Sequence, residues 1–446
     1  MCSPSMKYYE WMVECANVVN SRNSEIQKRR IAAAFAVIAA IEENKRRKYK
    51  KKKYWVAEIF ENRAVHGFYH AIFPILRLES SRFINYCRMS ATEFEELLCL
   101  VGPTISKQYV VRDPISAPER LALTLRFLAS GDSMMSLSYQ YLLGITTVSN
   151  IIKETCQAIW NALCPVVLKP NMKAEWLAVS KSFNEKCQFP NCIGALDGKH
   201  IMIQCPNKSG SAYYNYKGAH SIVLLAMCDA NYMFVSVDIG AYGRQSDGGI
   251  FKHSLLGQKL EANTMDLPAP KPLWENGPDL PYVIVADEAF PLTPYLLRPY
   301  SGKDGLSTEQ RIYNYRLSRA RRMIENSFGI LASQWRIFRK PILASVENVI
   351  KIVQATICLH NFLRKSNINN AGNYGNPELI DREDENYDII PGQWRCTVTN
   401  NNAFNDINSR GTNNHSRISA AIRNNFCEYF NEEGAVPWQF LQIYKQ

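Results

Sequence analysis

The sequence predicts an α/β protein whose sheet-forming part follows a helical region. Two short apolar runs, Cys192–Leu196 and Val283–Ala286, each lead directly into an aspartate, which is the pattern of a buried strand that ends at the edge of a sheet. Asn314–Leu331 lacks proline and repeats apolar residues every three or four positions, which indicates a helix with one apolar face. Upstream, residues 81–185 show helical periodicity.

Three acidic residues occupy these segments. Asp197 and Asp287 follow the apolar runs, and Glu325 lies beside Ile324 at the margin of the helix's apolar face. Ligands bind at strand ends in α/β sheets, and Mg²⁺ is usually held by a few carboxylates together with substrate phosphate. Two such ions can activate water and stabilise the leaving oxygen of a displacement at phosphorus. The three acids therefore predict a divalent-metal site, with ordinary caps, turns or surface residues as the alternative.

Several sequence blocks occur together in a recognisable order. They are Gly194–Ile201 (GALDGKHI), Tyr213–Gly218 (YYNYKG), Gly243–Gly249 (GRQSDGG), Ala286–Leu292 (ADEAFPL) and Asn314–Glu325 (NYRLSRARRMIE), which continues to Trp335-Arg336. These blocks resemble the DDE-superfamily transposases of the PIF/Harbinger type, and in particular the domesticated Harbinger transposase-derived nucleases of animals. The resemblance runs from about Phe83 to Arg364.

The resemblance implies an RNase H-like catalytic core, which is a mixed sheet flanked by helices. Asp197 is expected to end the first strand, and Ile222–Met227 and Tyr232–Ile239 are expected to form the next two. Asp287 is expected to end the fourth strand, and Glu325 to lie on the helix that follows.

The resemblance also implies a metal-dependent DNA endonuclease that hydrolyses phosphodiester bonds with two Mg²⁺ or Mn²⁺ ions. Asp197, Asp287 and Glu325 are the implied catalytic residues and metal ligands, and Asp247 is implied as a further ligand. The chain departs from the family pattern at two positions. Ala332 stands where a lysine is common seven residues past the glutamate, and Glu288 follows the aspartate where a small residue is common.

Residues 81–185 contain a helix-turn-helix pattern, in which Ser136–Leu142, a turn at Gly144 and a longer helix from Thr146 to Ile159 follow one another. A plain helical bundle packed on the core is the alternative, and the resemblance favours the helix-turn-helix. Seven residues are expected to contact DNA: Thr146, Thr147, Asn150 and Lys153 in the second helix, and Lys217, Arg321 and Arg322 near the acidic residues.

A net charge of +11 favours an acidic partner, with nucleic acid first. Near the N-terminus, a cationic run predicts a nuclear-import signal or a phosphate-contacting arm. The run consists of Lys45, Arg46, Arg47, Lys48, Lys50, Lys51, Lys52 and Lys53. The expected location is the nucleus, with the cytoplasm as a second site. The apolar stretch Ile31–Ile41 is too short to span a bilayer, so no membrane association is expected.

Four regions are expected: a basic helical region (1–80), the helix-turn-helix region (81–185), the endonuclease domain (186–365) and an Asn-rich, partly disordered tail with a terminal helix (366–446). The resemblance also suggests a Myb-like DNA-binding partner. A homo-oligomer is a further expectation, because DNA-end-joining enzymes often work as dimers or larger assemblies. Two other functions remain open. One is a catalytically silent DNA-binding or scaffolding protein with the same fold, and the other is an RNA-directed nuclease.

Overall fold

A computed structural model describes residues 29, 32–38, 56–108, 113–302, 305–370, 374–397, 404–406 and 416–445. The chain divides into two units, Met1–Glu61 and Asn62–Gln446. In the first unit, residues 32–38 are helical and Glu58–Phe60 forms a 3-10 helix, η1. The cationic run at 45–53 lies outside the described residues.

The second unit contains the sheet and the helices that cover it. Its described helices are α3 (Arg63–His66), α4 (Phe68–Ala71), α5 (Phe73–Leu78), α6 (Ser80–Cys87), α7 (Ala91–Ile105), α8 (Ala117–Ser130), α9 (Met134–Tyr141), α10 (Ile145–Val167), α11 (Lys173–Cys187), α12 (Asp247–His253), α13 (Leu255–Glu261), α14 (Thr308–Gln334), η2 (Arg336–Arg339), α15 (Val346–Asn370), η3 (Pro377–Leu379), α16 (Gln393–Thr397), α17 (Arg417–Asn431) and α18 (Gln439–Tyr444). Its described strands are β1 (Cys192–Met202), β2 (Ser221–Cys228), β3 (Phe234–Tyr242), β4 (Val283–Val285), β5 (Leu296–Leu297), β6 (Arg382–Glu383), β7 (Ile389–Ile390) and β8 (Phe404–Asp406).

Helices α7 to α10 form where the periodicity predicted them. Helix α7 begins with a capping box, in which Ser90 Oγ accepts from the Glu93 amide and the Glu93 carboxylate accepts from the Ser90 amide. Helix α8 begins after Ser116, whose side chain caps the helix by accepting from the Glu119 amide. Helix α9, a turn through Gly144 and helix α10 follow in the predicted order, and α10 continues eight residues past Ile159 to Val167. The contact of α10 with DNA stays a prediction.

The main sheet has the strand order β3-β2-β1-β4-β5. Strands β1, β2 and β3 pair antiparallel, whereas β4 pairs parallel with both β1 and β5. This mixed sheet flanked by helices confirms the predicted fold class. Strand β8 comes from the C-terminal part of the chain and pairs with the second half of β1, at Lys199–Ile201.

The prediction that Asp197 ends its strand was wrong. Strand β1 continues five residues further to Met202, because its antiparallel pairing with β2 is unbroken from Ala195↔Cys228 to Met202↔Ser221. The polar His200 did not interrupt the strand, because its side chain is fully buried and its Nδ1 bonds to Ser221 Oγ of β2 at 2.9 Å.

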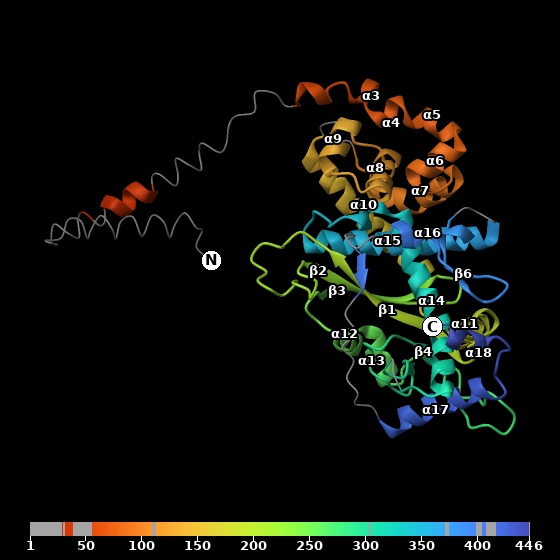
Figure 1. Cartoon of the computed structure of the whole chain (residues 1–446). Coiled ribbons are helices and arrows are strands. Elements are labelled where there is room, and N and C mark those ends of the chain that lie inside the picture. Colours follow the sequence, from red (N-terminus) through yellow and green to blue (C-terminus); the bar gives the residue numbers. More distant parts are fainter. Residues whose placement is uncertain are drawn as a thin grey trace. The chain divides into compact units, whose positions relative to one another are not determined.

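Helices cover both faces of the sheet (Figure 1). Helices α10, α14 and α15 belong to the larger apolar core, which also contains Phe234, Phe328 and Phe404. Helices α12 and α13 pack on the opposite face and contribute to a separate apolar cluster with Leu196 and Ile284. Within the described residues, no helix is both long and apolar enough to cross a membrane.

Candidate active site

Register brings Asp197 and Asp287 to equivalent positions on neighbouring strands. The parallel pairing of β1 with β4 ends at Ala195↔Val285, and each aspartate lies two residues beyond that pair. Neighbouring strands lie about 4.8 Å apart, so the two carboxylates share one end of the β1–β4 junction. On this edge, β1 pairs with β4 as far as Ala195 and with β8 from Lys199 onwards. Asp197 therefore lies at the point of β1 where neither β4 nor β8 is paired with it.

Asp247 supplies a third carboxylate, from the first turn of α12. Its side chain is 3% exposed, and its Oδ1 is buried without a hydrogen-bond partner. Burial raises the pKa of Asp247 to about 8, and the negative charges of Asp197 and Asp287 add to the rise. These electrostatic effects show that the three aspartates lie close enough to repel one another.

Asp287 lies in the loop after β4, where its Oδ1 accepts from the Ala289 amide at 2.9 Å. Burial raises its pKa to about 6, and the charge of Asp197 acts in the same direction. Arg321 and Lys199 oppose this rise. Lys199 also lies beside Asp197, with 3.5 Å between its Nζ and Asp197 Oδ2. Protein cations therefore offset part of the negative charge.

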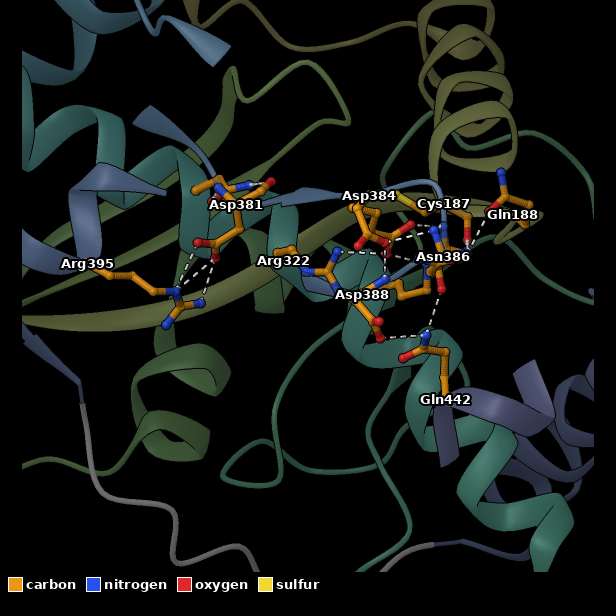
Figure 2. Close-up of polar contacts among 12 residues, drawn as sticks. Cys187, Gln188, Arg322, Asp381, Asp384, Asn386, Asp388, Arg395 and Gln442 are labelled. Carbon is orange, nitrogen blue, oxygen red and sulfur yellow. Dashed lines mark hydrogen bonds and ion pairs between the residues drawn. The ribbon is translucent and has the colours of Figure 1, made fainter. Parts of the chain in front are cut away.

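Glu325 lies on α14, as predicted, but its carboxylate contacts two arginines. Its Oε1 is 3.6 Å from Arg321, one turn earlier on the helix, and its Oε2 is 3.5 Å from Nη2 of Arg395 on α16. Arg395 is itself fixed by Asp381, whose buried carboxylate accepts from Arg395 Nε at 2.9 Å and from Nη2 at 2.6 Å (Figure 2). Arg395 is thus held at the Glu325 end of the site.

Helix α16 docks on α14 through Trp394. The indole N–H of Trp394 donates to Asn326 Oδ1 at 3.1 Å, and its ring lies against Gly329 so closely that a Cβ there would lie 2.5 Å from the ring. The guanidinium of Arg395 stacks 4.5 Å from the centre of the same ring. A residue of the C-terminal part of the chain is therefore placed beside Glu325 by packing and hydrogen bonds.

The donor set fits a hard divalent cation in its chemistry. Asp197, Asp247 and Asp287 offer only oxygen ligands, and the unpartnered Oδ1 of Asp247 lacks the compensation that a buried carboxylate needs. Across the residues that the structure describes, no three His, Cys, Asp or Glu side chains converge tightly enough to hold a metal ion. The predicted four-carboxylate set is thus only partly assembled, because Glu325 is turned to Arg321 and Arg395.

The other sequence-predicted residues lie in different surroundings. Arg322 is buried, and its guanidinium is paired with Glu383 at 2.8 Å. Lys217 lies beside the Tyr216 ring, and its pKa is lowered chiefly by partial desolvation and further by the positive charge of Lys199. The remaining four residues lie on α10: Thr146 and Asn150 are exposed, Thr147 is half-buried, and Lys153 contacts Glu347 of α15 at 3.5 Å.

Three residues of the site were missed by the sequence reasoning. Lys199 carried a local signal, since it lies two residues after Asp197 and therefore on the same face of the strand. Asp381 and Arg395 carried none, because they lie in a segment predicted as part of the Asn-rich tail. Their positions depend on contacts with α14 that span at least 55 residues of sequence.

The chain is similar in sequence to a known family and to several known proteins. Residues 196–361 match a family model described as DDE superfamily endonuclease. The chain is 27% identical to Protein ALP1-like of Arabidopsis thaliana over 282 residues. The matched segment covers 63% of this chain and 64% of that protein. It is 25% identical to the A. thaliana protein named Antagonist of like heterochromatin protein 1, over 64% of this chain and 73% of that protein. It is 24% identical to the human protein named Putative nuclease HARBI1, over 59% of this chain and 72% of that protein. No solved structure matches the chain significantly.

Proposed function

Residues 196–361 belong to the DDE superfamily endonuclease family, and from this premise we propose that the protein is a divalent-metal-dependent DNA endonuclease of Harbinger-transposase descent. The match agrees with the family resemblance that the sequence blocks predict and with the RNase H-like arrangement of the sheet. The catalytic activity, the metal and the DNA substrate are parts of the proposal.

One observation carries the proposal: the carboxylates of Asp197, Asp247 and Asp287 gather at the β1–β4 junction, where Asp247 keeps a buried oxygen without a partner. Such a concentration of negative charge in a buried place costs folding free energy. A protein retains an arrangement of this kind when a cation or a reaction requires it.

In the proposed function, different residues of the site would bind the metal, balance the charge and contact the phosphate. Asp197, Asp247 and Asp287 would hold Mg²⁺ or Mn²⁺, and Glu325 would join them once its carboxylate turns away from the two arginines. The bound cations would supply activation of water and stabilisation of the departing 3′ oxygen. Lys199 and Arg321 balance the remaining charge. Arg395 presents its Nη1, which makes no hydrogen bond within the described residues, and this group is suited to a phosphate oxygen.

Cleavage of supercoiled plasmid in Mg²⁺ or Mn²⁺ tests this function. Wild-type protein should nick the plasmid, and Asp197→Asn, Asp287→Asn and Glu325→Gln should each abolish nicking, because these changes keep shape and remove charge. Glu261→Gln is a matched control, since Glu261 is exposed at the end of α13. The proposed nuclease activity would be rejected if folded wild-type protein showed no metal-dependent nicking, either alone or with a Myb-like partner added.

A catalytically silent DNA-binding protein is the second candidate. The contacts of Glu325 with Arg321 and Arg395 favour it, because they occupy the carboxylate that would complete the metal site. The name of one relative, which refers to antagonism of a heterochromatin protein, mentions no nuclease. Retained DNA affinity without cleavage would identify this case. The cationic run at 45–53 supports a further proposal, that the protein acts in the nucleus.

A further inference from the structure

Four arginines from three separate elements converge away from the carboxylate site. Arg88 caps α6, Arg126 lies on α8, and Arg336 and Arg339 begin and end η2. Burial lowers the pKa of Arg88 to about 10, and the positive charges of Arg336, Arg339 and Arg126 add to this shift. Burial also lowers the pKa of Arg339, and the charge of Arg336 acts in the same direction. The four residues, called here the arginine cluster, are therefore within electrostatic reach of one another.

The local sequence of η2 explains why two of these side chains lie together. Trp335, Ile337 and Phe338 are buried and anchor η2 in the main core. Arg336 and Arg339 lie three residues apart, and side chains at this spacing eclipse each other in a 3-10 helix. The apolar residues thus turn inwards and the two arginines lie along one outer edge.

Close backbone packing brings that edge against α8. Gly131 ends α8 with a φ of 69°, and a Cβ at this position would lie 2.9 Å from the carbonyl oxygen of Arg336. Arg126, one turn before the end of α8, is held over the Tyr86 ring at 4.7 Å. The cluster is consequently built by the fold and does not depend on flexible side chains alone.

The protein leaves most of this charge uncompensated. Within the described residues, Asp132 is the one carboxylate in an ion pair with the cluster, 3.5 Å from Arg126. The Nε atoms of Arg88, Arg126 and Arg339 are buried without a hydrogen-bond partner. The cluster thus contains four guanidinium groups and one carboxylate partner. The repulsion among the guanidinium groups destabilises the free protein.

The position of the cluster indicates which polyanion would relieve the repulsion. Asp132 is followed by Ser133, the cap of α9, and α9 is the first helix of the predicted helix-turn-helix. DNA bound by α9 and α10 would have its backbone close to the end of α8. We propose that the arginine cluster binds the phosphate backbone of DNA next to the helix-turn-helix.

The proposal rests on the proposed function in naming DNA, but it does not require cleavage. Contacts of this kind position a duplex without reading its sequence. They release condensed counterions, so they should appear in the salt dependence of binding.

The test is the affinity for a labelled DNA duplex, measured by fluorescence anisotropy in EDTA over a range of salt concentrations. The variant Arg336→Gln/Arg339→Gln should bind roughly tenfold more weakly, and the slope of log K against log salt should become less steep by about 1.8. A matched control is Arg77→Gln/Arg82→Gln, which removes the same charge from two arginines already paired with Glu95 and Glu79. The control should change the slope much less.

The thermal midpoint separates binding from a structural role. Because the arginines repel one another, the glutamine pair should leave the midpoint unchanged or raise it, and Arg336→Lys/Arg339→Lys should keep most of the salt slope. An unchanged affinity and slope, an effect no larger than the control's, or a lowered midpoint would each overturn the proposal. Because metal is absent, a failure here is distinct from a failure of plasmid nicking.

Discussion

Asp247→Asn should stabilise the metal-free protein, although it removes a proposed metal ligand. The pKa of Asp247 rises from 3.8 to about 8 in the folded state, chiefly through burial. Between these values the unfolded chain has lost this proton while the folded protein keeps it, so stability falls as pH rises. Above the pKa of Asp247 in the folded state, the ionised carboxylate lowers the free energy of unfolding by its full amount. Below the pKa in the unfolded state, it lowers the free energy of unfolding not at all.

The magnitude follows from the size of the shift. One pKa unit corresponds to about 1.4 kcal/mol, and at pH 7 the group lies about three units above its unfolded pKa, so the cost has an upper limit of about 4 kcal/mol. Asparagine keeps the shape and cannot ionise. Because the amide also needs partners in a buried place, we expect a net gain of about 1–3 kcal/mol at pH 7.

The assay is urea denaturation in EDTA at several pH values between 5 and 8, with Glu261→Gln as the control. The difference between Asp247→Asn and wild type should grow with pH. Addition of Mn²⁺ should raise the midpoint of wild type more than that of the variant, because the variant has lost a ligand. A pH-independent difference, or a variant that is less stable throughout, would refute the electrostatic reasoning.

Three further outcomes are expected. Mn²⁺ affinity, measured by calorimetry, should rise between about pH 6 and 8, because the metal must displace protons from Asp287 and Asp247, and a flat profile would contradict their raised pKa values. Arg395→Gln should lower DNA affinity and the nicking rate, and unaltered kinetics would remove Arg395 from the site. It should also lower the unfolding midpoint, because the buried carboxylate of Asp381 loses its guanidinium partner. Gly329→Ala should destabilise the protein by about 1–3 kcal/mol, as shown by denaturation, because its methyl group overlaps the Trp394 ring, and no loss would mean that α16 is free to move.

Local patterns were sufficient to predict most elements of the core. Apolar runs identified β1 and β4, and the helical period identified α14, which begins six residues before and ends three residues after the predicted bounds. The extent of β1 was not predictable in this way. It depends on pairing with β2 and on the hydrogen bond of His200 to Ser221, and both partners lie about twenty residues further along the chain.

The electrostatic surroundings of α14 were harder to predict. Arg321 and Arg322 are adjacent in sequence and were assigned the same role, but Arg322 pairs with Glu383 whereas Arg321 reaches towards Asp287 and Glu325. A helix turns by 100° per residue, so neighbours meet different surroundings. Only the placement of the segment around Glu383 distinguishes them, and that segment was expected to be partly disordered.

Protein cations compensate the carboxylates of the site unevenly. Lys199 lies against Asp197, and Arg321 and Arg395 lie against Glu325, so protein cations reduce the repulsion where they reach. None of these three cations forms an ion pair with Asp247 within the described residues, and its pKa is raised further than that of Asp287. A divalent ion would therefore gain most by binding beside Asp247. If Glu325 joined these carboxylates as a ligand, Arg321 and Arg395 would lose their contacts with it and would be available to phosphate, so that metal binding and DNA binding should strengthen each other.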